Sequence, residues 1–224
     1  MKIIYGSGNK AKVEKVVNFF RANKIEIEVL SLKDIGFDRE IIENGKTFEE
    51  NSLIKAKAIK EFCNEKNINE IIITDDAGLC VDALDGRPGI YSARYAGDHA
   101  SQEETIAKLL DEIKDVSESK RTAQFVCVLT AISTNGEIVT ARGETKGSIA
   151  QKPGLMGKLT YGPIFVPEKF EKVMNELTQE ELGETHREKA LAEIVRKLNI
   201  KHLKRKKMNF QISVKKNLKM KLKS

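Results

Sequence analysis

The sequence predicts an α/β fold in which helices flank a mixed central sheet. Strand and helix patterns alternate through the first half of the chain. A strong hairpin signal, Asn135-Gly136, then separates two strand-like segments. Alternation favours parallel strands joined by helices, whereas a hairpin adds an antiparallel pair, so the two signals together indicate a mixed sheet.

The N-terminal part supplies three strands and two helices in alternating order. A first strand is expected at Lys2–Gly6 and a helix at Lys10–Arg21, which carries apolar residues at helical spacing. Apolar and acidic residues alternate over Ile25–Leu30, which indicates a half-exposed second strand. A long helix is expected from Thr47 to about Glu65, with Thr47 as N-cap and Glu50 completing a capping box. The next strand is expected at Glu70–Asp75.

The remainder of the chain supplies the hairpin and the last helices. Ser101 opens a capped helix through about Lys114. Strands are expected at Thr122–Ser133 and Glu137–Gly143, with a short extended piece at Pro163–Pro167. An amphipathic helix is expected at Arg187–Leu198.

The composition is that of a globular protein. The chain has 224 residues, of which 40% are hydrophobic and 32% charged. No apolar run approaches the ~20 residues needed to span a bilayer, and no signal-peptide pattern opens the chain, so no membrane partner is expected. The three cysteines, Cys63, Cys80 and Cys127, form no C-x-x-C pair, which indicates neither a disulfide framework nor a zinc site and favours a cytoplasmic location.

The positive charge is concentrated at the C-terminus. The whole chain carries a net charge of +6, but residues 201–224 hold ten Lys/Arg and no Asp/Glu. Without them, 29 basic residues face 33 acidic ones. We therefore expect a mildly acidic domain at residues 1–200 and a basic, disordered extension at 201–224.

Two adjacent carboxylates follow the apolar run Ile71–Ile73, where the strand is expected to end. Neighbours along a strand point to opposite faces, so Asp75 and Asp76 share one role only if the backbone bends, which Ala77-Gly78 permits. Carboxylates at the mouth of an α/β sheet suit a hard cation such as Mg²⁺. Taken alone, the pair would favour a polar turn after a core strand.

Two further segments could meet a phosphate. The turn Ser7–Lys12 lies between a strand and a helix N-terminus, where backbone amides and the helix dipole attract anions. Ser7 and Asn9 add donors and Lys12 adds charge, although an ordinary turn would be the better interpretation in isolation. Glu50 could cap its helix or bind a metal, and Lys55 could meet a phosphate.

Four motifs in this order and spacing resemble the inosine/xanthosine triphosphate pyrophosphatase family, whose members hydrolyse non-canonical purine nucleoside triphosphates. The resemblance runs from about residue 1 to about residue 198. The motifs are S-G-N-K-x-K at Ser7–Lys12, T-F-x-E-N at Thr47–Asn51, D-D-x-G-L at Asp75–Leu79, and the segment Asp82–Tyr95.

The resemblance implies a fold of two lobes with the active-site cleft between them, a homodimer, and nucleoside monophosphate and pyrophosphate as products. It implies that Asp76 is the catalytic proton acceptor and holds Mg²⁺ with Glu50, with Asp75 beside them. Lys55 would neutralise phosphate charge. The implied substrate-binding residues are Ser7, Gly8, Asn9, Lys10, Ala11, Lys12, Lys55, Ala77, Leu159, Thr160, Tyr161, Gly162, His186 and Arg187.

The departures from the family pattern concentrate on the side that reads the base. The family's F-G-[YW]-D loop is Leu159-Thr160-Tyr161-Gly162 here, so the stacking aromatic and the carboxylate are both absent. Ala77 stands where the family usually has serine, and S-H-R reads Thr185-His186-Arg187. Without the resemblance, His186 and Arg187 would be interpreted as the start of an exposed helix. Relaxed base selectivity is therefore expected more than loss of hydrolysis.

A second hypothesis comes from a different class of function. It is a diverged paralogue with weak activity that binds nucleotide or RNA through its basic tail, around Lys204–Lys207. The presence of Asp76, Glu50 and Lys12 favours the enzyme, and nucleic acid is not the favoured partner.

Overall fold

The computed structural model describes residues 1–157 and 159–200, and these form one mixed six-stranded sheet with strand order β2-β1-β3-β4-β5-β6. The extension predicted at 201–224 lies outside the described residues. Strand β1 pairs in parallel with β2 and β3, and the remaining pairs are antiparallel. The strands are β1 (Lys2–Tyr5), β2 (Glu28–Ser31), β3 (Ile71–Val81), β4 (Thr122–Ile132), β5 (Ile138–Ile149) and β6 (Phe165–Pro167).

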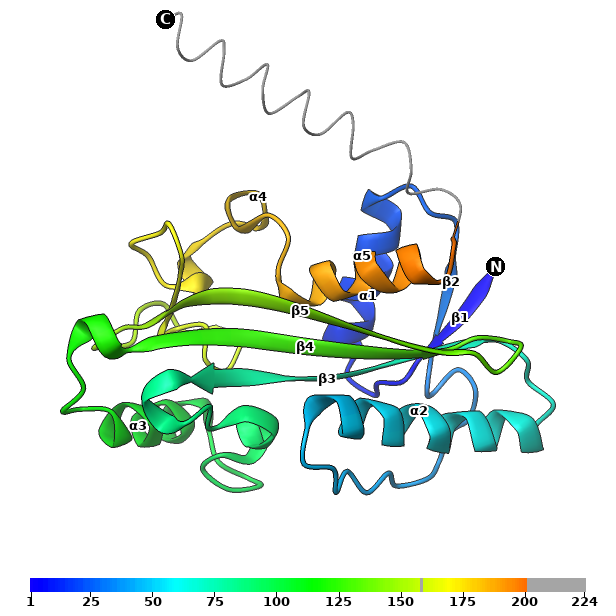
Figure 1. Ribbon diagram of the computed structural model, residues 1–224, viewed down its shortest axis with the longest axis horizontal. Coiled ribbons are helices and arrows are strands. Elements are labelled where there is room, and N and C mark those ends of the chain that lie inside the picture. Colours follow the sequence, from blue (N-terminus) through cyan, green and yellow to red (C-terminus); the bar gives the residue numbers. More distant parts are fainter. Residues whose placement is uncertain (158, 201–224) are drawn as a thin grey trace, which may run out of the picture.

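Helices cover both faces of the sheet at its parallel end. Apolar side chains of α1 and α5 pack on one face, and those of α2 pack on the other (Figure 1). Helix α3 lies at the opposite end of the long strands. The helices are α1 (Lys10–Ala22), α2 (Phe48–Glu65), α3 (Gln102–Glu112), α4 (Gln179–Leu182) and α5 (His186–Lys197). None of the helices in the described part of the chain combines the length and the hydropathy that a membrane span requires.

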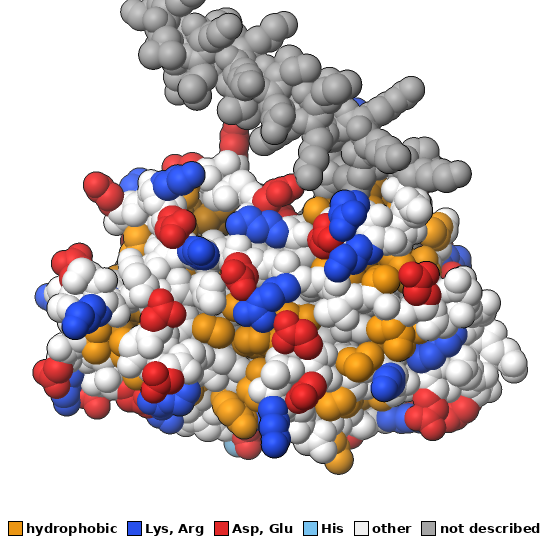
Figure 2. Space-filling view, in the orientation of Figure 1, with side chains coloured by type: hydrophobic (Ala, Val, Ile, Leu, Met, Phe, Trp, Pro, Cys, Tyr) orange, Lys and Arg blue, Asp and Glu red, His pale blue; other side chains and the backbone are white. Residues whose placement is uncertain are grey.

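The apolar core is divided along the strands β3, β4 and β5, which gives the chain its two lobes. One lobe is built around β1, α1 and α5, with α2 on the opposite face, and the other is built around α3, β6 and the turns near Tyr161. On the face shown in Figure 2, acidic and basic side chains intermingle rather than forming a patch of one sign.

Three of the local signals are confirmed. Thr47 caps α2, Ser101 forms a complete capping box at α3, and Asn135-Gly136 joins β4 to β5. The second strand is shorter than predicted, and the short helix α4 was not predicted. The capping box at α2 is only half formed: Thr47 Oγ1 accepts from the Glu50 amide, but the Glu50 carboxylate accepts from the Lys46 amide instead of that of Thr47.

Strand β3 differs from the prediction in a way that matters for the site. It does not end at Asp75 but continues to Val81, because β4 pairs with it from Ile72 to Val81 without a break. Gly78 therefore makes no bend. A Cβ atom at Gly78 would lie 2.2 Å from the Gly89 carbonyl oxygen, so the small residue admits a close approach of the Gly89–Arg94 turn to the strand.

Strand β5 also extends past its predicted end at Gly143. A Cβ atom at Gly143 would lie 2.0 Å from the His186 carbonyl oxygen. Glycine there lets the first turn of α5 lie directly on the strand, which places His186 and Arg187 against the sheet.

Candidate active site

The site lies where the parallel pairing between β1 and β3 stops. The paired residues end at Tyr5 and Ile73, so β1 no longer covers the edge of β3 beside Asp75 and Asp76. A cavity of about 650 Å³ opens here, and its lining includes Ser7, Lys12, Lys55 and Asp75. The carboxyl edge of parallel strands is where α/β folds commonly bind their ligands.

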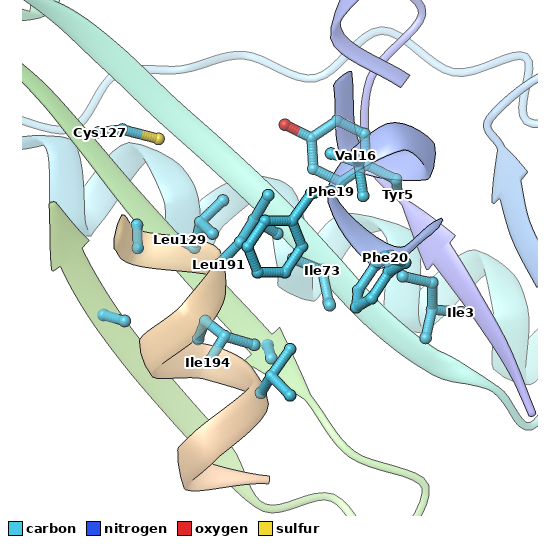
Figure 3. Packing of buried hydrophobic residues seen from close by; sticks show 14 of the residues in the cluster. Ile3, Tyr5, Val16, Phe19, Phe20, Ile73, Cys127, Leu129, Leu191 and Ile194 are labelled. Carbon is cyan, nitrogen blue, oxygen red and sulfur yellow. The ribbon is translucent and has the colours of Figure 1, made fainter. Parts of the chain in front are cut away.

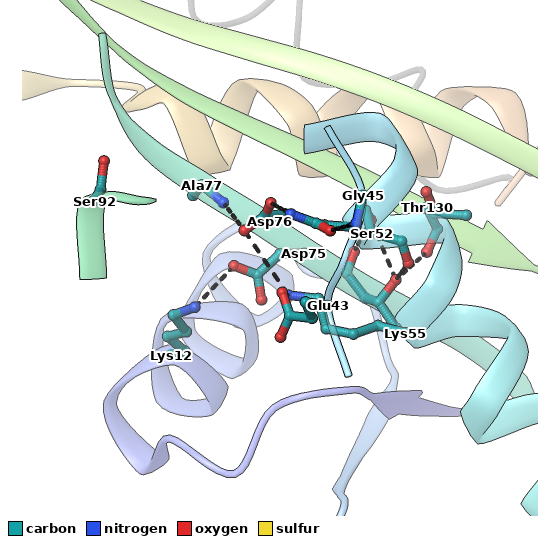
Figure 4. Close-up of polar contacts among 12 residues, drawn as sticks. Lys12, Glu43, Gly45, Ser52, Lys55, Asp75, Asp76, Ala77, Ser92 and Thr130 are labelled. Carbon is teal, nitrogen blue, oxygen red and sulfur yellow. Dashed lines mark hydrogen bonds and ion pairs between the residues drawn. The ribbon is translucent and has the colours of Figure 1, made fainter. Parts of the chain in front are cut away.

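The two adjacent carboxylates face opposite sides of the sheet, as the strand geometry predicts in the absence of a bend (Figure 4). Asp75 contacts Tyr5 and Arg187 on the side of α1 and α5. Asp76 contacts Asn51 on α2. They are therefore two separate groups at one uncovered edge.

Asp75 is a buried anion held by three donors. Its side chain is 1% exposed and accepts from Tyr5 Oη at 2.8 Å, Lys12 Nζ at 3.2 Å and Arg187 Nη1 at 2.5 Å. Burial alone would raise the pKa of this carboxyl, but the charges of Arg187 and Lys12 outweigh burial and hold the pKa well below its usual range. These contacts favour an anchoring role for Asp75 over the metal-ligand role that we expected.

Asp76 has the environment of a general base. Its oxygens accept from Asn51 Nδ2 at 3.1 Å and from the Ala77 amide at 3.0 Å, and Lys55 Nζ lies 3.9 Å away. Burial raises the pKa of Asp76, while Lys55 and the hydrogen bond from Asn51 oppose that rise. A carboxylate whose pKa is raised toward neutrality is better able to accept a proton from water.

Glu43 is a site residue that sequence reasoning missed. Its carboxylate lies 2.8 Å from Lys55 Nζ and lines the cavity. Neither Glu50 nor Asp76 is among the lining residues, but Asp76 lies 3.9 Å from Lys55 Nζ, whereas Glu50 accepts from the Lys46 amide. The loop is folded back onto α2 because the Gly45 amide donates to Asn51 Oδ1 at 2.9 Å. A Cβ atom at Gly45 would lie 2.7 Å from that oxygen, so the glycine before the helix cap was the available signal.

The acidic side chains fit a hard divalent cation that also binds substrate oxygens. The described residues contain no group of three or more His, Cys, Asp or Glu side chains that could hold a metal alone. Asp76 and Glu43 supply carboxylate oxygens near Lys55, which lies within 4 Å of both. Mg²⁺ is commonly bound by one or two carboxylates together with waters and substrate phosphates, so this donor set suits it.

The predicted phosphate turn is ordered by its own polar side chains. Asn9 Oδ1 accepts from the amides of Ala11 and Lys12, and Ser7 Oγ accepts from the amide of Asn9. Of the six residues expected to hold phosphate, only Ser7, Gly8 and Lys12 line the cavity. Asn9 therefore shapes the turn as the cap of α1, and Lys12 brings the charge.

The predicted base-reading loop lies away from this cavity. Tyr161 is buried, and its hydroxyl donates to the Ser92 carbonyl at 2.9 Å, so its ring is part of the core of the second lobe. Gln102 Nε2 holds the loop by donating to the carbonyls of Leu159 and Thr160. A Cβ atom at Gly162 would lie 2.0 Å from Asn175 Oδ1, so the Asn175 side chain occupies that space.

His186 and Arg187 are not the start of an exposed helix, as the sequence alone would indicate. Both side chains are buried where α5 meets β4 and β5. The His186 ring stacks on Phe125 with centroids 5.1 Å apart, and its Nδ1 atom has no hydrogen-bond partner among the described residues. Burial, followed by the charges of Arg187 and Lys15, lowers the pKa of His186 to about 3.

The protein should lose stability in mild acid through His186. An unfolded histidine titrates near pH 6.5, so below that pH the unfolded chain binds a proton that the folded chain refuses. Stability contributed by neutral His186 is therefore complete above about pH 6.5 and falls by roughly 2–3 kcal/mol between pH 6.5 and 4. Urea unfolding of wild type and His186→Gln across this range should show a flatter pH profile for the variant. His99→Gln, at an exposed histidine, should keep the wild-type slope.

This chain is similar in sequence and in structure to proteins of one family. The dITP/XTP pyrophosphatase of Clostridium perfringens is 38% identical over 195 residues, which cover 86% of this chain and 95% of that protein. The dITP/XTP pyrophosphatase of Bacillus subtilis is 38% identical over 192 residues, covering 85% and 93%. The HAM1 protein of Coxiella burnetii has a similar structure, with a TM-score of 0.78, 30% identity, and coverage of 88% of this chain and 98% of that chain.

A structure of the Staphylococcus aureus Ham1 protein also matches, with a TM-score of 0.75, 35% identity, and coverage of 88% of this chain and 98% of that one. The sequence model of the Ham1 family matches residues 3–197. That range includes both carboxylates of β3, the cavity and the first turn of α5. The chain belongs to the Ham1 family.

Proposed function

We propose that this protein hydrolyses non-canonical purine nucleoside triphosphates (ITP, dITP and XTP) to the nucleoside monophosphate and pyrophosphate, which removes them from the nucleotide pool. The observation that carries the proposal is the cavity where the pairing of β1 with β3 stops. Lys12 and Lys55 line it, and Lys55 Nζ lies 3.9 Å from Asp76, a carboxylate whose pKa is raised by burial. The relatives named dITP/XTP pyrophosphatase support the substrate class.

Each residue of the site has a distinct part in this proposal. Lys12 and Lys55 bind phosphate oxygens, and the Ser7-Gly8 turn lets the chain approach them closely. Asp76 accepts a proton from the attacking water, and Asn51 orients its carboxylate. Asp76 and Glu43 would hold Mg²⁺, which when bound would offset the charge of the phosphates.

The test is a substrate panel. Purified protein with Mg²⁺ should release pyrophosphate from ITP, dITP and XTP with a higher kcat/KM than from ATP, CTP or UTP, and with only a slightly higher kcat/KM than from GTP. Chelation of the metal should abolish the release. A protein that releases no pyrophosphate from any member of the panel would contradict the proposal. The homodimer that the family resemblance implies and the cytoplasmic location that the cysteines favour stay predictions, which gel filtration and cell fractionation would check.

Discrimination between ITP and GTP should be weak, because the loop at Leu159–Gly162 lacks a stacking aromatic and a carboxylate. Restoring them requires three changes, since Asn175 fills the space beside Gly162. Leu159→Phe with Gly162→Asp and Asn175→Ala should raise kcat/KM for ITP over that for GTP by about tenfold, which is the scale of one hydrogen bond from the base to the restored carboxylate. Asn175→Ala alone is the control. An unchanged ratio in the triple variant would show that this loop does not read the base.

A further inference from the structure

A group of four side chains behind the cavity joins four separate elements. Tyr5 comes from β1, Lys12 from α1, Asp75 from β3 and Arg187 from α5. Lys12 and Asp75 line the cavity, whereas Tyr5 and Arg187 lie behind them. Arg187 Nη1 donates both to Asp75 Oδ2 at 2.5 Å and to Tyr5 Oη at 2.9 Å, and Tyr5 Oη donates to Asp75 Oδ1 at 2.8 Å.

The charges of this group do not cancel. One carboxylate faces two cations, because Lys12 Nζ also lies 3.2 Å from Asp75 Oδ2. The Arg187 side chain is 11% exposed and the Lys12 side chain is 38% exposed. Arg187 therefore offsets the buried charge of Asp75 from behind. Lys12 keeps a positive charge that the cavity presents to an anion.

The hydroxyl of Tyr5 fixes the orientation of the carboxylate between the two cations. The Tyr5 ring is completely buried, in the apolar cluster that includes Val16 and Phe19 (Figure 3). Its hydroxyl cannot move far, since the ring is enclosed by this cluster. By donating to Oδ1 it leaves Oδ2 for Arg187 and Lys12.

We propose that Tyr5 is a positioning residue for the phosphate-binding lysine. Through Asp75 and together with Arg187, it holds the Lys12 ammonium at one place in the cavity, ready for the phosphates of a nucleoside triphosphate. This inference rests on the proposed function for the identity of the substrate. The positioning of Lys12 for a polyphosphate can be tested separately, because binding of a polyphosphate can be measured without hydrolysis.

The first measurement is binding of inorganic tripolyphosphate by calorimetry at fixed salt and Mg²⁺ concentrations. Tyr5→Phe keeps the ring and removes one hydrogen bond to a charged group, so we expect about three- to tenfold weaker binding. The KM for XTP should rise by the same factor with kcat within about twofold, since a phosphate contact held in ground and transition states affects KM.

The chain offers a matched control. Tyr95 donates to Glu112 at 2.6 Å, and Arg87 approaches both, so these three residues repeat the chemistry of the Tyr5 group outside the cavity lining. Tyr95→Phe should leave tripolyphosphate binding within about twofold of wild type. Thermal melting of both variants checks that they fold. Should Tyr5→Phe not fold, Arg187→Lys keeps the charge but not the double contact, and should weaken binding similarly.

A double-mutant cycle decides whether Tyr5 acts through Lys12. In the Lys12→Ala background, Tyr5→Phe should weaken tripolyphosphate binding by less than about twofold, because the group that it positions is gone. An equal effect in both backgrounds, or no effect of Tyr5→Phe on wild type, would overturn the inference. A protein that binds tripolyphosphate in this way but hydrolyses no nucleoside triphosphate would contradict the proposed function alone.

Discussion

Asp76→Asn should reduce kcat for XTP hydrolysis by about 10²–10⁴-fold, the scale of losing a general base. The amide keeps the size of the carboxylate and can still contact Asn51, but it neither accepts a proton nor carries the charge that a divalent cation requires. The measurement is initial-rate pyrophosphate release at saturating Mg²⁺ and XTP.

The control for this variant separates chemistry from folding. Asp76→Asn removes a carboxyl whose pKa is raised by burial, so the variant should be at least as stable as wild type. Asp98→Asn, at an exposed carboxylate outside the cavity lining, should keep activity within about twofold. A folded Asp76→Asn protein with near wild-type turnover would remove Asp76 from the mechanism.

Arg187→Met should destabilise the protein by about 3–5 kcal/mol, because it leaves Asp75 buried with only part of its compensation. The pair joins residues 112 positions apart in the sequence, and both side chains lie in the core between α5 and the sheet. Urea unfolding at pH 7 measures the loss.

Two companion variants test the cause. Arg196→Met removes an exposed arginine that pairs with Glu193, and should cost no more than about 1 kcal/mol. Combining Arg187→Met with Asp75→Asn removes the unpaired charge and should recover part of the lost stability. The single variant Asp75→Asn completes the comparison. If Asp75→Asn lowers the free energy of unfolding as much in the Arg187→Met background as it does in wild type, the two residues do not act as a pair.

The parts of the fold that local chemistry determines could be predicted from the sequence. Thr47 and Ser101 cap their helices, and Asn135-Gly136 turns the hairpin, because each signal acts within a few residues. The predicted end of β3 was wrong. Ala77-Gly78 permits a turn when the sequence is considered alone, because the sequence does not show which strand pairs with this segment. Pairing with β4 keeps the chain extended through both residues.

The site residues also fall into two groups, those that could be named from the sequence and those that only the folded structure shows. Asp76, Lys12 and Lys55 could be named because the family resemblance includes them, and the structure brings them to one edge of β3. Glu43 and the Tyr5 hydroxyl could not, since their contacts depend on a folded-back loop and on a helix almost two hundred residues away. The burial of Tyr161 could not be predicted either, because a tyrosine in a loop gives no sign of whether its ring is buried.

The most direct test of the central claim is the identity of the products formed from XTP. Phosphorus NMR of a reaction with the wild-type protein and Mg²⁺ should show xanthosine monophosphate and pyrophosphate appearing in equal amounts. The signals should stay absent with Asp76→Asn over the same time. Release of inorganic phosphate with xanthosine diphosphate, or equal rates for wild type and Asp76→Asn, would contradict the proposal that Asp76, beside the cavity at Lys55, takes part in cleaving nucleoside triphosphates to pyrophosphate.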